Sequence, residues 1–300
     1  MDLPIEHLTT FATIVRLGSF EAAAARLHIT PSAVSQRVRA MEQRAGAVLL
    51  QRSRPVQVTA SGATILRLAR QFELLASDAA RELGGEPSSG SPIPIVVNAD
   101  SLATWFMPAL ARTAQLTGAQ FDVLRADESV STERLRSGEA MAALTATDAA
   151  VPGCTSARLG VVRYRAVASP EFVAAHFAPV DGIPAVTRDS LATAPIVEFD
   201  QHDTYQRRFI AFVTRAQLSP PRHFIPSSAE FALAAEHGLG WGMLPDLQCA
   251  AALRSGTLVE LMPGKTLDVP LYWQRWNLSS PVLDTLSDVV MEVARAALAP

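Results

Sequence analysis

The segment between Gly18 and Glu42 constrains the fold more strongly than any other part of the chain. Gly18 is suited to end one helix and Ser19 to cap the next, and apolar residues follow at helical spacing. Another helix is expected to begin at Pro31, because the N–H group that proline lacks would have no partner at a first helical position. The segment therefore predicts two short helices joined by a tight turn.

The second of these helices combines an apolar face with a polar face. Val34, Val38 and Met41 recur as a stripe that can be buried. Serine, glutamine and arginine reach base edges and phosphates, and a helix N-terminus adds N–H donors and a partial positive charge. The polar face consists of Ser32, Ser35, Gln36 and Arg39. The pattern favours a helix that lies in the major groove of DNA, and an ordinary helix hairpin with a polar outer face is the alternative.

Charge is distributed unevenly along the chain. The formal net charge is −3 at pH 7, which by itself does not indicate a nucleic-acid-binding protein. Residues 1–70, however, hold nine arginines against four acidic residues, a net charge of +5, which leaves −8 for residues 71–300. Because positive charge attracts the phosphate backbone, DNA binding is expected at the N-terminus.

A basic segment follows the second helix. Residues 49–59, LLQRSRPVQVT, are typical of two short extended pieces around an Arg-Ser-Arg-Pro tip. Arg52 and Arg54 at this tip can lie along phosphates or enter the minor groove. A solvated charged hairpin would contain the same residues, but beside the helix pair the segment is interpreted as a wing.

The stretch LGSFEAAAARLHITPSAVSQRVRAMEQRAGAVLLQRSRPVQVTASG resembles the N-terminal domain of the LysR-type transcriptional regulators almost continuously. The resemblance implies a winged helix-turn-helix domain at residues 1–60 that binds double-stranded DNA. It places the DNA-reading positions in the second helix and the wing, at Pro31, Ser32, Ser35, Gln36, Arg39, Arg52 and Arg54. Arg37 is expected among the arginines that contact DNA.

Residues 60–83 lack proline and carry apolar residues at alternating spacings of three and four, as in a coiled-coil seam. A helix packed on its own domain would show the same stripe. Because LysR-type regulators pair through this helix, the resemblance implies a linker helix at residues 61–83 and a homodimer. Such a dimer implies an inverted-repeat operator with half-sites about 34 Å, or a multiple of that, apart. Many family members form tetramers, although the sequence carries no direct sign of one.

Residues 84–92, GGEPSSGSP, consist almost entirely of glycine, serine and proline and predict a flexible hinge. Beyond the hinge, apolar runs such as residues 93–97 and 196–199 alternate with helical patterns, which is typical of an α/β domain. The resemblance implies a two-lobed effector domain of the periplasmic-binding-protein type at residues 93–300. The first lobe is expected at 93–166 with 269–300, and the second at 167–268. The expected fold class is therefore α+β multidomain.

Acidic and hydroxyl side chains follow the expected strands, where open α/β sheets bind their ligands. Hydroxyls and free N–H groups at helix starts suit a carboxylate, and acids suit an ammonium or guanidinium group. Taken singly, each acid could also be a turn former or a helix cap. The cluster as a whole indicates an effector site formed by Asp100, Ser101, Trp105, Asp127, Glu128, Thr147, Asp148, Asp203, Ser227 and Ser228.

The whole chain further resembles the branch of this family that senses lysine and arginine and controls basic amino-acid export. The resemblance lies in NADSLATWFMPAL, DESVSTERLRSG and ALTATDAAVPGC. It implies lysine or arginine as effector and an exporter gene as target. We further hypothesise that effector binding alters promoter occupancy by RNA polymerase. Two alternatives stay open at this point: a LysR-type regulator of another metabolic operon with a different effector, and a small-molecule binding module without a DNA function.

The sequence offers little support for catalysis. It contains no G-x-S-x-G, H-E-x-x-H or C-x-x-C motif, and its six histidines lack the spacing of zinc ligands. Cys154 and Cys249 stand 95 positions apart and fit buried thiols in a reducing compartment. There is no basic and apolar leader and no run of 18 apolar residues. We therefore expect a cytoplasmic protein without enzymatic activity, cofactor, metal or membrane partner.

Overall fold

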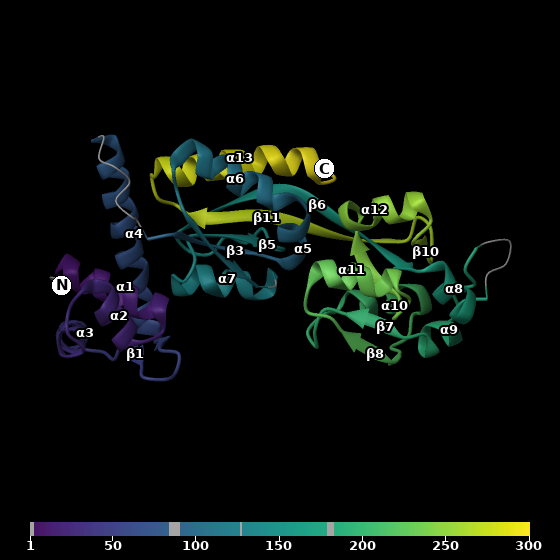
Figure 1. The fold of residues 1–300 in the computed structure, drawn as a ribbon, viewed down its shortest axis with the longest axis horizontal. Helices are drawn as coiled ribbons and strands as arrows, with labels where there is room; N and C mark the ends of the chain where they lie inside the picture. Colours follow the sequence, from purple (N-terminus) through teal and green to yellow (C-terminus); the bar gives the residue numbers. More distant parts are fainter. Residues whose placement is uncertain (1–2, 84–90, 127, 179–182) are drawn as a thin grey trace. The chain divides into compact units, whose positions relative to one another are not determined.

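The computed structural model describes residues 3–83, 91–126, 128–178 and 183–300. It divides into two compact units, whose elements are labelled in Figure 1. The first unit contains Met1–Val97, Leu110–Ala157 and Trp273–Val289, and the second contains Asn98–Ala109, Arg158–Tyr272 and Val290–Pro300.

The first unit begins with three helices and a small hairpin: α1 (Ile5–Leu17), α2 (Phe20–Leu27), α3 (Pro31–Ala45), β1 (Leu50–Gln51) and β2 (Gln57–Val58). Gly18 ends α1 with a φ of 68°. The Ser19 hydroxyl accepts a hydrogen bond from the Ala22 N–H at 3.1 Å, and the Thr30 hydroxyl accepts one from the Ala33 N–H at 3.2 Å. The helix pair predicted from these residues is therefore confirmed.

Helix α4 (Ala60–Glu82) forms part of the core of this N-terminal domain. Its residues Ile65, Leu66 and Ala69 are buried together with the apolar faces of α1 and α3. Gly62 lies so close to the hairpin that an added Cβ atom would be 2.0 Å from the Leu49 carbonyl oxygen. The first turns of the predicted linker helix thus belong to the domain that precedes them.

The same helix contacts the segment between α7 (Glu128–Ser137) and β5 (Ala142–Thr145). Arg67 donates to the Arg136 carbonyl at 2.6 Å, and Arg70 donates to the Glu139 carbonyl. Gly138 has a φ of 80°, and an added Cβ atom would be 3.0 Å from the Arg67 backbone nitrogen. A side chain at this turn would therefore push α4 away.

Parallel strands form the sheet of the first unit. β3 (Ile93–Val97) pairs in parallel with β4 (Phe121–Arg125) on one side and with β5 on the other. The last residues of β11 (Thr266–Trp276) lie next to β5, where the Trp276 N–H donates to the Met141 carbonyl at 2.9 Å. In Figure 1, α7 lies on the opposite side of these strands from α6 (Met107–Thr117) and α13 (Pro281–Ala297).

The second unit is built around the long strand β6 (Cys154–Ala168), most of which belongs to it. β6 pairs antiparallel with β9 (Gly242–Pro245) and β10 (Val259–Glu260), and it neighbours β11 in the sheet order. β7 (Ile196–Glu198) and β8 (Arg222–Phe224) form a separate parallel pair. The helical segments are α5 (Ala99–Ser101), the π-helix η1 (Leu102–Phe106), α8 (Pro170–His176), α9 (Arg188–Thr193), α10 (Tyr205–Thr214), α11 (Ser228–Glu236) and α12 (Asp246–Ser255).

The structure agrees with the predicted fold class of an N-terminal helix-turn-helix domain followed by a mixed helix and sheet domain. The predicted hinge, residues 84–92, lies outside the described residues except for Ser91 and Pro92. The two compact units group residues by packing, whereas the predicted lobes follow the topology of the chain. The lobe boundaries therefore stay a prediction.

We predict that Gly62→Ala destabilises the protein, although alanine favours a helix over glycine by about 1 kcal/mol. The added Cβ would overlap the Leu49 carbonyl, and such overpacking costs about 1–3 kcal/mol. Urea unfolding of the full chain measures the change in the free energy of unfolding. Ser61→Ala, at the exposed neighbouring position, is the matched control and should shift it by less than about 0.5 kcal/mol. A stabilising Gly62→Ala would contradict the close approach.

Candidate DNA interface and effector site

Helix α3 exposes the residues that the sequence assigns to DNA reading. Pro31, Ser32, Gln36 and Arg39 are exposed, and Ser35 is half-buried. Val34, Val38 and Met41 are buried in the core of the N-terminal domain, so they fix the orientation of the helix. The polar face is therefore free to contact a groove, as the amphipathic pattern predicts.

Arg37 differs from the other predicted interface residues. Its guanidinium group donates to the Thr10 hydroxyl at 3.0 Å and pairs with the Glu6 carboxylate at 3.1 Å, and the side chain is 25% exposed. These contacts tie α3 to α1. They favour a packing role for Arg37, which its place in the sequence does not reveal.

The hairpin carries two exposed arginines, Arg52 and Arg54. The guanidinium carbon of Arg52 lies 5.4 Å from the centre of the Phe20 ring, a cation–π distance. The Val56 N–H donates to the Gly18 carbonyl at 2.9 Å and so holds the hairpin against the turn before α2. Arg52 is thus positioned beside the first residue of α2 rather than free in solution.

An acidic cluster lies in the second unit, where Asp100 of α5 contacts β6 and α11. One carboxylate oxygen of Asp100 accepts a hydrogen bond from the Tyr164 hydroxyl at 2.7 Å, and the other accepts one from the Ser228 hydroxyl at 2.7 Å. The ring centres of Tyr164 and Tyr205 are 4.7 Å apart. Predicted residues Asp100 and Ser228 are therefore brought together from positions 128 residues apart.

Asp203 lies close to this cluster. Its carboxylate accepts hydrogen bonds from the backbone N–H groups of Phe199 and Tyr205, both at 2.9 Å. Burial raises the pKa of Asp203, and the negative charge of Asp100 raises it further, although the two backbone donors oppose the shift. Because the two carboxylates repel each other when both are ionised, a bound cation would stabilise their ionised forms.

Two buried donors without a hydrogen-bond partner among the described residues follow Asp100 in the chain. They are the Ser101 hydroxyl and the Trp105 indole N–H, and both side chains are almost fully buried. Trp105 belongs to the π-helix η1, a rare element that is often found at functional sites. Buried unsatisfied donors are costly, so an acceptor brought by a ligand would satisfy them.

The remaining predicted effector residues have different surroundings. Ser227 caps α11 without a side-chain capping bond, and its hydroxyl contacts Glu230. Thr147 and Asp148 are exposed and belong to the first unit. Asp127 lies outside the described residues, and Glu128 is described only as the first residue of α7. Their roles stay predictions.

Sequence reasoning missed Tyr164, Tyr205 and Gln248. Gln248 of α12 donates to the Ser228 carbonyl at 2.6 Å. The two tyrosines stand among only three in the chain. A tyrosine in a strand or at a helix start more often packs in the core than binds a ligand, so the pattern alone does not single out Tyr164 or Tyr205. Within the described residues, every helix is too short or too polar to span a membrane.

Comparison with known proteins gives consistent results for the whole chain. The pattern of the bacterial regulatory helix-turn-helix proteins of the lysR family matches residues 5–63, and that of the LysR substrate binding domain matches residues 91–295. The chain is similar to the HTH-type transcriptional regulator LysG of Mycobacterium tuberculosis, with 42% identity over 289 residues that cover 96% of this chain and 92% of that protein.

Two solved structures are also similar. The crystal structure of ArgP from Mycobacterium tuberculosis has a TM-score of 0.83 and 41% identity, covering 98% of this chain and 97% of that one. Full-length LysG from Corynebacterium glutamicum with bound effector Arg has a TM-score of 0.76 and 35% identity, covering 99% of this chain and 100% of that one. The chain belongs to the LysR family of bacterial helix-turn-helix regulatory proteins.

Proposed function

We propose that this protein regulates transcription in response to a basic amino acid, lysine or arginine, and that its target is an exporter gene for such amino acids. The observation that carries the proposal is the pair of interacting carboxylates, Asp100 and Asp203. Ser101 and Trp105, which follow Asp100 in the chain, each have a buried donor without a hydrogen-bond partner among the described residues. The relative from Corynebacterium glutamicum whose structure contains bound Arg, and whose curated name is a lysine export transcriptional regulatory protein, supports it.

The residues of the acidic cluster divide into two chemical sets. Asp100 and Asp203 would accept hydrogen bonds from the guanidinium or ammonium group of the effector, and arginine could bind a carboxylate through two parallel bonds. Ser101 and Trp105 would donate to the α-carboxylate, which would satisfy their buried donors. A neutral amino acid would leave both carboxylates without a cation and would bind more weakly.

DNA binding in this proposal uses the exposed face of α3 together with Arg52 and Arg54 of the hairpin. The exposed apolar residues Leu68, Phe72 and Leu75 of α4 fall on one helical stripe and would pair with a second copy of the chain. A homodimer through α4 would read an inverted repeat in cytoplasmic DNA and act on RNA polymerase, and assembly into a tetramer is compatible with this arrangement. The proposal assigns no reaction, cofactor or metal to the chain.

Effector binding can switch such a regulator only if the effector binds one conformation more tightly than the other. Helix α4 is suited to carry the change, because it is part of the DNA-binding domain and is also held by Arg67 and Arg70 at the turn after α7. A shift of α7 would therefore move the helix on which the DNA-binding domain is built.

For the DNA interface, we predict that Arg52→Ala lowers the affinity for the DNA upstream of the protein's own gene by roughly tenfold and reduces the salt dependence of binding by about one counterion. Fluorescence anisotropy with labelled DNA over a range of salt concentrations measures both. Arg136→Ala, at an exposed arginine outside the N-terminal domain, is the control and should change neither. Unchanged salt dependence in Arg52→Ala would show that the hairpin does not contact phosphates.

For the effector, we predict that calorimetric titration shows arginine and lysine bound more tightly than leucine or citrulline. Asp100→Asn should weaken arginine binding by roughly tenfold or more, because it removes a charge-assisted hydrogen bond. Asp189→Asn, at an exposed position of α9, should leave it unchanged. Equal affinities for leucine and arginine would contradict the proposal.

We also predict that arginine affinity depends on pH through Asp203. Because burial raises the pKa of this carboxyl above the ordinary 3.8, it takes up a proton at a higher pH than a solvated aspartate does. Affinity for a cation should therefore fall as the pH falls through the raised pKa. Titrations of the wild type and of Asp203→Asn across the acidic range test this: the variant should bind weakly with a flatter pH profile. A wild-type affinity that rises on acidification would be inconsistent with this role.

A further inference from the structure

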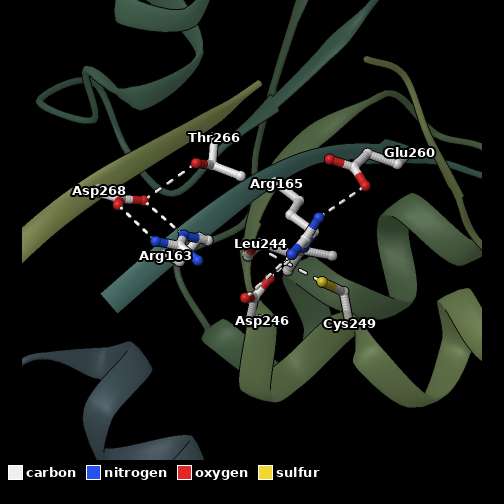
Figure 2. Close-up of polar contacts among 8 residues, drawn as sticks. All are labelled: Arg163, Arg165, Leu244, Asp246, Cys249, Glu260, Thr266 and Asp268. Carbon is white, nitrogen blue, oxygen red and sulfur yellow. Dashed lines mark hydrogen bonds and ion pairs between the residues drawn. The ribbon is translucent and has the colours of Figure 1, made fainter. Parts of the chain in front are cut away.

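Arg165 follows Tyr164 in β6 and lies among acidic side chains (Figure 2). Its guanidinium group pairs with both oxygens of Asp246 and donates to Glu260 at 2.9 Å. Neighbouring strand residues point to opposite faces, so Tyr164, which holds Asp100, and Arg165 leave the strand on different sides. One short piece of β6 therefore holds Asp100 directly and the start of α12 through an ion pair.

The ion pair fixes the first turn of α12. Asp246 is the first residue of this helix, where a negative charge is favourable, and Gln248 follows in the same turn. The Gln248 carboxamide donates to the Ser228 carbonyl at 2.6 Å. A shift of the α12 start would therefore move Gln248 away from Ser228.

Ser228 connects this turn to the acidic cluster. Its hydroxyl donates to Asp100 at 2.7 Å, and its backbone is held by Gln248 at the first residue of α11. A continuous set of polar contacts therefore runs from Arg165 through Asp246, Gln248 and Ser228 to the carboxylate of Asp100.

Two neighbouring carboxylates, those of Asp246 and Glu260, balance the positive charge of Arg165. Burial raises the pKa of the neighbouring Cys249 thiol to about 12, so this side chain stays neutral near pH 7 and leaves Asp246 and Glu260 as the partners of the guanidinium group. The side chain of Glu260 is 13% exposed, and that of Arg165 is 26% exposed. Removing Arg165 would leave a largely buried carboxylate without its cation, which a protein tolerates poorly.

A second ion pair on the same strand supplies an internal comparison. Arg163 lies two residues earlier and pairs with Asp268 at 3.0 Å, also shown in Figure 2. Their side chains are 41% and 44% exposed. Arg163 interacts with Asp246 through charge alone, whereas Arg165 is hydrogen-bonded to it. An exposed pair of this kind contributes little to stability.

We infer that Arg165 is a positioning residue for the effector site: through Asp246, Gln248 and Ser228 it holds the Asp100 carboxylate in the orientation that selects a cationic effector. The inference rests on the proposed function. It goes beyond that function because Arg165 does not contact Asp100 and carries the same charge as the proposed effector. Arg165 therefore affects the preference for a cationic effector by positioning Asp100, and not by binding the effector.

The experiment compares arginine with citrulline, which has the same shape without the positive charge. Calorimetric titrations of the full chain should show that Arg165→Ala lowers arginine affinity by roughly tenfold and citrulline affinity by much less, so the preference for the cation is lost. Arg163→Ala, the matched control, should retain the wild-type preference. Gln248→Ala, which leaves the Arg165 ion pairs in place, should reproduce the loss and keeps the test valid if Arg165→Ala fails to fold.

A double-mutant cycle tests the route of the effect. If Gln248 acts through Asp100, Gln248→Ala should lower arginine affinity in the wild type and change it little in the Asp100→Asn background. The inference would be overturned if Gln248→Ala and Asp100→Asn lowered arginine affinity additively. It would also be overturned if Arg165→Ala kept the preference for arginine over citrulline, or if Arg163→Ala lost as much arginine affinity as Arg165→Ala. Failure of the proposed function looks different, because the wild type itself would then fail to prefer arginine over citrulline.

Discussion

The packing of α4 is the constraint on which the rest of the first unit depends. Its first turns are part of the hydrophobic core of the N-terminal domain, and Gly62 leaves no room between the helix and the Leu49 carbonyl. A few residues later, Arg67 and Arg70 bind carbonyl groups at the end of α7, where positive charge complements the helix dipole. The helix therefore cannot shift at one place without disturbing the other, and this rigidity is what a ligand-controlled DNA-binding protein requires.

Electrostatics separates the two binding functions along the chain. The N-terminal residues carry the excess of arginine, and the face of α3 and the hairpin present it to solvent. The second unit instead holds the neighbouring carboxylates of Asp100 and Asp203, and burial raises the pKa of Asp203. This separation of charge attracts a polyanion to the N-terminal domain and, in the proposed function, a cation to the second unit.

Much of the N-terminal domain could be predicted because its signals are local. The caps Ser19 and Thr30, the glycine after α1 and the apolar stripe of α3 each act over three or four residues, and the structure places all of them as expected. The role of Arg37 could not be predicted in this way. The sequence pattern does not show that Arg37 pairs with the Glu6 carboxylate of a neighbouring helix, and the prediction that Arg37 contacts DNA stays a prediction.

The sequence by itself determined where the helices of the N-terminal domain begin and where charge accumulates, because these properties depend on neighbouring residues. Only the tertiary structure decided that Asp100 meets Tyr164, 64 positions away, and Ser228, 128 positions away. The same holds for the path from Arg165 to Ser228 through α12. Such contacts depend on how strands and helices pack. The spacing of residues along the sequence does not predict which distant side chains this packing brings together.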